Sequence, residues 1–292
     1  MTRFGSILQV NWDWRAAGNF MFGGTGSSLM FMTALAYYPA TPNMLIGLSA
    51  LAFVGLGLFL VWLEIGRPLR FLHVYFHPQR SWMTREAFIA LVLFALALVG
   101  VLFKLASVIA LAGLCGLLFL YCQGRILKES KGIPAWREPA VVPLIIATGL
   151  SEGTAIFIIL TLLLDSAPAW ANYLLLVFIA LRLFAWNHYR GKLAASDAPG
   201  KTRRILANIH TAQLLAGTII PAILIVLAIT MANIAGIALI ISGLLIVLSG
   251  WQLKFTIVAR ASQVQGYALG KLRKGRPTIR PPVRRKPDKF VF

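Results

Sequence analysis

The sequence predicts an all-α integral membrane protein with eight transmembrane helices, and three observations lead to this fold class. The 292 residues are 59% hydrophobic and 13% charged, whereas a soluble chain is about half apolar and roughly a quarter charged. Apolar runs of about 17–25 residues, the length that crosses a bilayer, recur along the chain. The Lys and Arg residues gather in every second linker between these runs. The length suits one bundle, with little left for a soluble domain.

Eight segments are long and apolar enough to be membrane-spanning helices. We expect them at residues 20–38, 44–65, 87–103, 105–123, 140–164, 169–188, 209–231 and 234–255. No alternation typical of strands competes with them, and a helix satisfies its own backbone groups in lipid. Residues 1–18 contain Asp13 and no apolar stretch, so we expect no signal peptide and a retained first helix.

The distribution of basic residues predicts the orientation. Of the 28 Lys and Arg residues, 26 lie at the N-terminus, in the linkers after the second, fourth and sixth helices, or in the C-terminal tail. Lys104, in a short turn, and Arg182, inside the sixth helix, are the exceptions. By the positive-inside rule, both termini and the long linkers are cytoplasmic. We therefore expect a multi-pass protein of the cell inner membrane.

The net charge of +19 follows largely from this orientation and from contact with the headgroups of membrane lipids. Nucleic-acid binding would need a folded basic module, and the sequence contains no recognisable one, so we expect no nucleic-acid partner. The chain divides into a membrane domain over residues 1–255 and a basic cytoplasmic tail over 256–292, whose prolines favour an extended form. The tail could contact lipid or dock on an acidic partner subunit.

The N-terminal segment NWDWRAAGNF, residues 11–20, leads into the first helix. Arg15 and Asn19 are four residues apart and share one helix face close to Trp12. An amphipathic lead-in at the membrane surface explains these residues without a function, and a ligand contact explains them equally well.

The linker EIGRPLRFLHVYFHPQRSWMTRE, residues 64–86, concentrates polar groups between two apolar helices. Gly66 and Pro68 end the second helix. Ser81 or Thr84 caps the third helix, and the helix dipole favours Glu86 in its first turn. These structural roles do not account for Glu64, His73, His77, Trp82 or Arg85, while Arg67 and Arg70 would lie at the membrane surface.

Two ionisable side chains lie within helices, where burial makes them costly. Glu152 is near the middle of the fifth helix, so it is either protonated or paired with a cation or water. A proton relay or ligand contact competes here with a neutral carboxyl bonded to a neighbouring helix. Arg182, Trp186 and Tyr189 share one face of the sixth helix, and His210 begins the seventh. Snorkelling and an interfacial aromatic belt are the alternatives to a site.

The histidines and cysteines predict that this chain holds no metal. All four histidines, His73, His77, His188 and His210, lie at the cytoplasmic rim. Haem in a membrane bundle needs axial ligands at depth, and iron–sulfur clusters need sets of cysteines that two residues cannot supply. We therefore expect no haem, and the metal centres of any redox complex would lie in another subunit.

The stretches LEIGRPLRFL and HPQRSWMTREAF resemble the signature of the dimethyl sulfoxide reductase membrane-anchor family. In that family a glycine–basic–proline turn precedes a Ser-Trp-X-Ser/Thr-Arg-Glu stretch that opens the third of eight spans. The later segment KFTIVARASQVQGYALGKL is similar to a subgroup that includes the anchors of sulfite-oxidising and phenylacetyl-CoA-oxidising molybdoenzymes. The resemblance covers most of the chain, beginning at NWDWRAAGNF.

The resemblance implies a haem-free subunit that anchors an iron–sulfur subunit and a molybdopterin catalytic subunit. Such a subunit exchanges two electrons and two protons with ubiquinone or menaquinone, and the subgroup implies electron flow toward the quinone. Glu64 departs from the pattern, because related anchors often carry histidine there, so the quinone ligand stays open. The long basic tail is a second departure. Partners on the cytoplasmic side also differ from the dimethyl sulfoxide reductase relatives and favour the sulfite-oxidising subgroup.

We expect the quinone at the cytoplasmic edge, because it needs an apolar cleft open to lipid, polar groups for its oxygens and a proton path. The expected catalytic residues are Glu152 and His73. The expected quinone-binding residues are Trp12, Arg15, Asn19, Glu64, Arg67, Trp82, Arg85, Arg182, Trp186, Tyr189 and His210. Two alternatives stay open: a secondary transporter or channel that uses Glu152 and Arg182, and a scaffold without a redox role.

Overall fold

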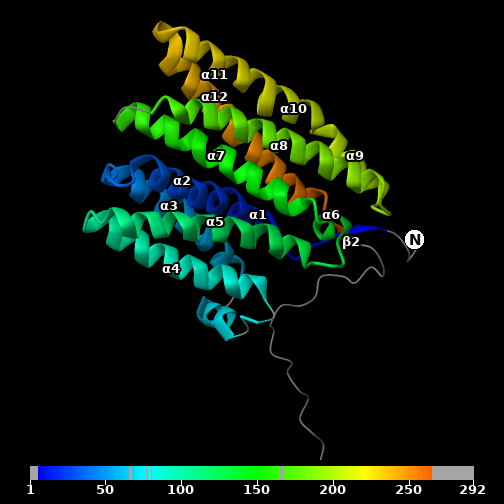
Figure 1. Cartoon of the computed structure of the whole chain (residues 1–292). Coiled ribbons are helices and arrows are strands. Elements are labelled where there is room, and N and C mark those ends of the chain that lie inside the picture. The colour runs from blue at the N-terminus through cyan, green and yellow to red at the C-terminus, as the bar shows by residue number, and fades with distance from the viewer. Residues whose placement is uncertain (1–5, 66–67, 77, 80, 165–167, 265–292) are drawn as a thin grey trace, which may run out of the picture.

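Long helices lie side by side and form one bundle (Figure 1). The computed structural model describes residues 6–65, 68–76, 78–79, 81–164 and 168–264. The first half comprises β1 (Ile7–Leu8), α1 (Trp14–Gly18), the π-helical turn η1 (Asn19–Gly23), α2 (Gly24–Tyr37), α3 (Met44–Glu64), the 3-10 helix η2 (Pro68–Phe76), α4 (Trp82–Leu102), α5 (Ala106–Lys128) and α6 (Pro134–Arg137). The second half comprises α7 (Val141–Leu164), α8 (Trp170–Ala194), α9 (Gly200–Asn208), α10 (His210–Leu214), the π-helical turn η3 (Leu215–Ile219), α11 (Ile220–Thr230), the 3-10 turn η4 (Ala232–Ile234), α12 (Ala235–Phe255), the π-helical turn η5 (Thr256–Arg260) and β2 (Gln263–Val264).

Seven helices of the described chain are long and apolar enough to cross a membrane, in agreement with the predicted all-α, multi-pass membrane fold. They cover Met44–Glu64, Trp82–Leu102, Ala106–Lys128, Val141–Leu164, Trp170–Ala194, His210–Thr230 and Ala232–Arg260. Each corresponds to one of the expected spans, with ends shifted by up to six residues. The third span begins earlier than expected because Ser81 caps it, and the sixth extends to Ala194.

The first expected span, residues 20–38, falls within a continuous helical run from α1 through η1 to α2, but this run is not among the seven apolar helices. Its sequence is rich in glycine, serine and threonine because it packs against other helices on several sides. A Cβ on Gly26 would lie 2.7 Å from the Ala50 carbonyl oxygen of α3, and a Cβ on Gly153 of α7 would lie 2.5 Å from the Ser28 backbone. Small residues of this kind let helices approach closely within a membrane.

The helix α2 lies in the middle of the bundle. It packs against α3, α5 and α7, while α4 lies against α5 at one edge and α11 lies against α12 at the other (Figure 1). Ten of the fourteen residues of α2 are buried, whereas the apolar helices α4 and α8 bury only a third of their most apolar windows. Helices at the edge therefore present apolar side chains outward, and the central helix does not need them.

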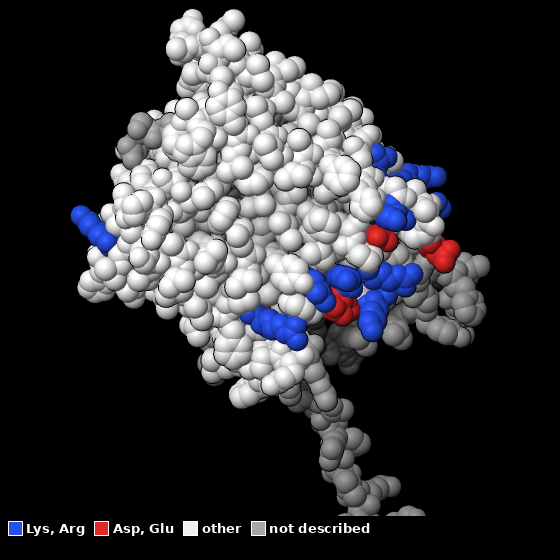
Figure 2. Space-filling model, viewed as in Figure 1, with Lys and Arg blue, Asp and Glu red and all other residues white. Residues whose placement is uncertain are grey.

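The two ends of the bundle differ in charge. Short turns join α2 to α3, α4 to α5 and α11 to α12 at one end, and the longer linkers with α6 and α9 lie at the other. Figure 2 shows Lys and Arg side chains gathered at the end where α6, α9 and β2 lie, which we call the basic end. The basic end thus collects the linkers that the sequence predicts to be cytoplasmic.

Both described ends of the chain meet at the basic end. The strands β1 and β2 pair antiparallel, with Ile7 opposite Val264 and Leu8 opposite Gln263. The predicted boundary at residue 255 falls inside a helix that continues through η5 to Arg260. Residues 265–292, most of the predicted tail, lie outside the described residues.

Candidate functional site

A small cleft opens at the basic end between α1, the end of α3 and the start of α4. It is lined by Trp12, Ala16, Asn19, Phe20, Val61, Glu64, Met83, Glu86 and Ile126. Apolar walls with a few polar groups are typical of sites for organic ligands. Its void of about 40 Å³ has room for roughly one water molecule. A larger ligand therefore needs lining side chains to move, and Met83, a flexible side chain that is 41% exposed, is suited to do so.

Glu86 lies on the buried floor of this cleft, so the predicted role in the first turn of the helix is wrong. Ser81 caps α4 by accepting a hydrogen bond from the Thr84 amide at 3.3 Å, which places Glu86 beyond the first turn. Its side chain points inward, where Asn19 Nδ2 donates to Glu86 Oε1 at 3.2 Å. The Gln123 side chain faces the same carboxyl group, and Gln123 Nε2 donates to the Asn19 carbonyl at 2.9 Å.

The rim of the cleft is ordered by Trp82, whose ring lies between two guanidinium groups. Arg85 Cζ is 4.2 Å and Arg125 Cζ is 4.3 Å from the ring centroid. Arg85 also donates to the carbonyls of Pro78 at 2.8 Å and Gln79 at 2.9 Å. These bonds fasten the end of the linker to the start of α4, so Trp82 and Arg85 shape the cleft from outside without lining it.

Arg15 fixes the other side of the rim. It forms an ion pair with Asp13 at 2.7 Å, and its Nη1 donates to the Leu63 carbonyl at 2.9 Å. Because helix carbonyls near a C-terminus lack partners within the helix, this bond satisfies the end of α3. Arg15 thereby holds α1 against α3 beside Glu64.

Two predicted residues of the linker stand apart from the cleft. His73 lies on η2 with an exposed side chain, and its ring meets the Phe76 ring edge-on at 5.6 Å. The structure does not bring His73 to the cleft. Arg67 lies outside the described residues.

Glu152 forms an ion pair with Lys254 deep inside the bundle. Lys254 Nζ donates to Glu152 Oε2 at 2.6 Å, and both side chains are fully buried. The Thr25 hydroxyl lies 2.7 Å from the same oxygen and accepts a hydrogen bond from Trp251 Nε1 at 3.1 Å. Of the two possibilities for Glu152, pairing with a cation is the one the structure shows. The expected eighth helix, residues 234–255, includes Lys254 near its end, but the charge count grouped this residue with the cytoplasmic tail. The structure shows instead that α12 carries the Lys254 side chain into the bundle.

Arg182 is the second buried cation, and only neutral groups bond it among the described residues. Its Nη1 donates to the Ile246 carbonyl at 3.1 Å, and its Nη2 donates to Gln213 Oε1 at 2.6 Å and to Ser249 Oγ at 3.0 Å. The Gln213 amide is held in turn by the Ser249 carbonyl at 2.9 Å. Gln213 lies two residues before the π-helical turn η3, and such turns are frequent at functional sites. Arg182 is 3% exposed and does not snorkel to the surface.

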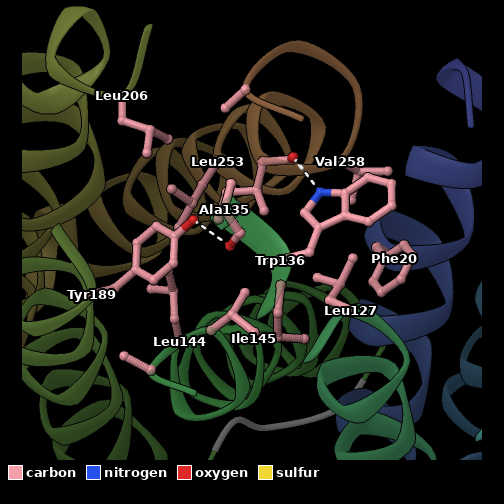
Figure 3. Packing of buried hydrophobic residues seen from close by; sticks show 14 of the residues in the cluster. Phe20, Leu127, Ala135, Trp136, Leu144, Ile145, Tyr189, Leu206, Leu253 and Val258 are labelled. Atoms are coloured by element: carbon pink, nitrogen blue, oxygen red, sulfur yellow. Dashed lines mark hydrogen bonds between the residues drawn. The ribbon is translucent and has the colours of Figure 1, made fainter. Parts of the chain in front are cut away.

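Tyr189, on the same helix as Arg182, packs into the apolar cluster shown in Figure 3, and Trp186 belongs to the same cluster. Phe20, which lines the cleft, is also a member of this cluster. The Tyr189 hydroxyl donates to the Ala135 carbonyl at 2.8 Å, and Trp186 Nε1 donates to His210 Nδ1 at 3.2 Å. The hydrogen bonds of the two side chains therefore tie α8 to α6 and to α10. Neither aromatic ring lines the cleft.

The structure thus divides the predicted site into three places: the cleft, the Glu152–Lys254 pair, and the α8 face with Arg182. The sequence argument missed Lys254, Gln123 and Glu86 as site residues. A signal existed for Lys254 and Gln123, since each is a polar residue near the end of a predicted span. For Glu86, a role at the start of the helix was a sufficient explanation, so nothing in the sequence indicated that its side chain points into the bundle.

The comparisons with known proteins leave the site to be interpreted from its geometry. No protein-family model and no curated protein matches this chain. Within the described residues, no group of three or more His, Cys, Asp and Glu side chains is placed to hold a metal ion.

Proposed function

We propose that this chain is the haem-free membrane anchor of an oxidoreductase complex whose molybdopterin and iron–sulfur centres lie in partner subunits. It binds ubiquinone or menaquinone in the cleft, and the iron–sulfur subunit, docked on the basic end, delivers electrons for quinone reduction as in the sulfite-oxidising type. The chain crosses the cell inner membrane eight times, with the basic end in the cytoplasm.

The observation that carries this proposal is the position of the segment from Ser81 to Glu86. Ser81 starts α4 at the basic end, Trp82 and Arg85 form the rim of the cleft, and Glu86 forms its floor. The stretch behind the family resemblance therefore builds part of a polar cleft at this end of the bundle.

The chemistry of the cleft suits a quinone, although its volume requires lining side chains such as Met83 to move. A bound quinone supplies two carbonyl oxygens that accept hydrogen bonds and take up two protons when the ring receives two electrons. Glu86 can hold a proton for one of these oxygens, and the Asn19 amide keeps its carboxyl group in position. Trp12 and Phe20, with ring centroids 6.0 Å apart, give the cleft an aromatic wall.

The basic end also offers a docking surface for the partner subunit. The half-buried Trp82 ring lies within 4.3 Å of the Arg85 and Arg125 guanidinium groups, and Trp and Arg side chains are enriched among the residues that anchor protein partners. Figure 2 shows further Lys and Arg side chains on this end, which would complement an acidic subunit.

Purification of the intact complex from its native membrane tests the proposal. We expect the chain to bring molybdenum and iron with it and to support quinone-linked turnover. Purification without either metal would refute the proposed anchor role. Turnover only with soluble electron acceptors would indicate a scaffold without a redox role.

The variant Glu86→Gln tests the cleft. It keeps the shape and the Asn19 contact but cannot release a proton, and proton transfer by a positioned side chain typically contributes about 10²–10⁴-fold to a rate. We expect quinone-linked turnover to fall about a hundredfold or more while a soluble electron acceptor still works. Glu138→Gln, an acid outside the cleft at the same end, is the matched control. A parallel loss of both activities would assign Glu86 to assembly of the complex.

The Glu152–Lys254 pair is the observation that favours the alternative, a secondary transporter, because buried charges within membrane bundles often mark ion or substrate pathways. Uptake assays on the chain alone in vesicles distinguish it. Transport without any partner subunit would support the alternative, and the anchor predicts none.

A further inference from the structure

Among the described residues, eleven buried side-chain nitrogen and oxygen atoms have no hydrogen-bond partner, and three of these are oxygens of residues between the cleft and the ion pair. They are Asn19 Oδ1, Gln123 Oε1 and Glu152 Oε1. Their side chains are 4%, 0% and 0% exposed. Buried acceptors in folded proteins are nearly always satisfied by protein or by ordered water. An unsatisfied acceptor costs about 1–3 kcal/mol, so three of them in one bundle point to bound water.

Glycines bring two of these oxygens, Asn19 Oδ1 and Gln123 Oε1, close to Lys254 of the ion pair, while Glu152 Oε1 lies against Gly250 of α12. Asn19 Oδ1 and Gln123 Nε2 are each 3.0 Å from the position that a Cβ on Gly23 would occupy. Gln123 Oε1 and Lys254 Nζ are 2.9 and 2.6 Å from the same position on Gly24. The absence of a side chain at both glycines therefore leaves polar atoms facing one another.

The gap between Gln123 Oε1 and Lys254 Nζ is no longer than a water bridge. Gln123 Oε1 and Lys254 Nζ are not hydrogen-bonded to each other, and their shared distance to Gly24 places them within about 5.5 Å. One water molecule between two polar atoms spans such a distance. Together with the hydrogen bonds from Asn19 to Glu86, from Gln123 to Asn19 and from Lys254 to Glu152, these groups form a line that runs from the floor of the cleft to Glu152.

We propose that this line, Glu86–Asn19–Gln123–Lys254–Glu152, is a water-filled proton path that connects the cleft with the buried ion pair. Water is the ligand of the site, and a proton is what the site exchanges. The role of the path in quinone reduction rests on the function proposed above, whereas its hydration does not.

The members of the line have different tasks. Glu86 and Glu152 are carboxyl groups that can hold a proton, while the amides of Asn19 and Gln123 orient water and hold none. Lys254 keeps Glu152 ionised when the site is empty. A proton arriving at Glu152 Oε1 converts the ion pair to a neutral acid beside an ammonium group, and release of that proton through the same waters restores the pair.

The path ends in the bundle and does not cross it. Beyond Glu152, toward the short-turn end, the buried polar side chains of the described helices are hydroxyl groups such as Ser28, Thr33 and Ser242. No acid among the described residues lies on that side. The pair therefore acts as a proton store for the cleft. Glu152 first takes up a proton that arrives along the path from the open side of the cleft. It then returns this proton to the quinone as the second of two, while Glu86 supplies the first, and both carboxylates regain their protons from the open side of the cleft.

A high-resolution structure of the full chain in a lipid disc tests hydration directly. We expect ordered water within hydrogen-bonding distance of Gln123 Oε1 and of Glu152 Oε1. If the map shows ordered water elsewhere in the protein interior but none at either oxygen, the proposed path is refuted.

Infrared difference spectra of the same sample test proton exchange without turnover. Stepping the external pH should change a protonated-carboxyl band that Glu152→Gln removes. In Gln123→Met, which keeps the volume but loses the oxygen, this band should appear at least tenfold more slowly. Gln123→Glu should restore the rate, and Thr148→Val, which removes a buried hydroxyl that bonds only its own helix, is the control. An unchanged rate in Gln123→Met, or a slow rate in every variant, would refute the path.

Turnover of the complete complex links the path to quinone chemistry. We expect Gln123→Met to lower quinone-linked turnover about tenfold with a raised solvent isotope effect, and to leave the soluble-acceptor rate unchanged. If the line is hydrated and exchanges protons but the complex does not use quinone, the proposed function is refuted and the proton path is supported. Normal quinone turnover in Gln123→Met would refute the path and keep the function.

Discussion

Lys254 and Arg182 are both fully buried cations, yet the bundle satisfies them in opposite ways. Lys254 faces a single carboxylate at 2.6 Å, whereas Arg182 spreads its charge over a carbonyl, an amide oxygen and a hydroxyl. The difference follows from the side chains. Guanidinium is planar with donors in a fixed fork and is weakly hydrated, while ammonium is a compact, strongly hydrated charge. A buried lysine therefore needs an anion, and a buried arginine can be held by neutral oxygens alone.

The comparison implies that the Lys254 site can change its charge and the Arg182 site cannot. Glu152 can gain or lose a proton beside Lys254, because the carboxyl group has two stable forms. All acceptors around Arg182 are neutral, and the guanidinium stays protonated in proteins. We therefore assign chemistry to the first site and architecture to the second.

The largest expected effect comes from removing the anion at the Lys254 site. Glu152→Leu leaves a buried ammonium group without a partner, and breaking a buried pair typically costs about 3–5 kcal/mol. Unfolding in denaturing detergent, monitored by steric trapping, measures the loss of stability. The double variant Glu152→Leu/Lys254→Met should regain most of it, because an apolar pair of similar volume is often neutral. A double variant as unstable as the single one would show that packing, not charge, dominates there.

A smaller effect is expected at the second cation. In Arg182→Lys the charge stays, but one ammonium group cannot reach the Ile246 carbonyl, Gln213 and Ser249 in the geometry of the fork. We expect a loss of roughly 1.5–3 kcal/mol, the cost of hydrogen bonds to a charged group. The same unfolding measurement checks it. Full stability in Arg182→Lys would mean that the two cations are interchangeable and would remove the contrast.

Substitutions at two glycines test the difference between the two cation sites. A Cβ on Gly24 would lie 2.6 Å from Lys254 Nζ and would displace it, whereas one on Gly217 would lie 3.2 Å from Arg182 Nη2. Overpacking costs typically about 1–3 kcal/mol. We expect Gly24→Ala to fall in this range and Gly217→Ala below it, with quinone-linked turnover reduced only by Gly24→Ala. Equal losses of turnover in the two variants would contradict separate roles for the two sites.

The smallest effect is expected away from both cations. Tyr189→Phe removes the hydroxyl bond to the Ala135 carbonyl and keeps the apolar packing. Side-chain hydrogen bonds in membrane bundles average about 0.6 kcal/mol. A loss of this size, with unchanged turnover, would support a structural role for the α8 face. A large loss of turnover at full stability would return Tyr189 to the site.

The sequence predicted the seven apolar helices because their length and apolarity depend on local composition alone. It also placed Glu152, Arg182, Asn19 and Glu64 among the important residues, because polar groups in or beside apolar helices stand out. It could not show that Glu152 meets Lys254, since their contact depends on how α7 and α12 pack. For the same reason it grouped the α8 face with the linker, although these elements lie in different parts of the bundle.

The first helix shows the opposite limitation. Glycine, serine and threonine make the run from α1 to α2 a weak candidate by composition, yet it lies at the centre of the bundle. Its character is explained by neighbours that the sequence does not show, such as the α3 backbone at Gly26. Hydropathy measures what a helix presents to lipid, and a central helix presents little.

The pairing of β1 with β2 has a consequence for biosynthesis. The two strands are separated by most of the described chain, with Leu8 opposite Gln263. At about 5–20 residues per second, a ribosome that has made Leu8 needs roughly 13–50 s to reach Gln263. During this time the least apolar helix is already synthesised, while Trp251 and Lys254, which complete the cluster around Thr25 and Glu152, are not. The insertion machinery or a chaperone must therefore shelter this helix until the last one arrives.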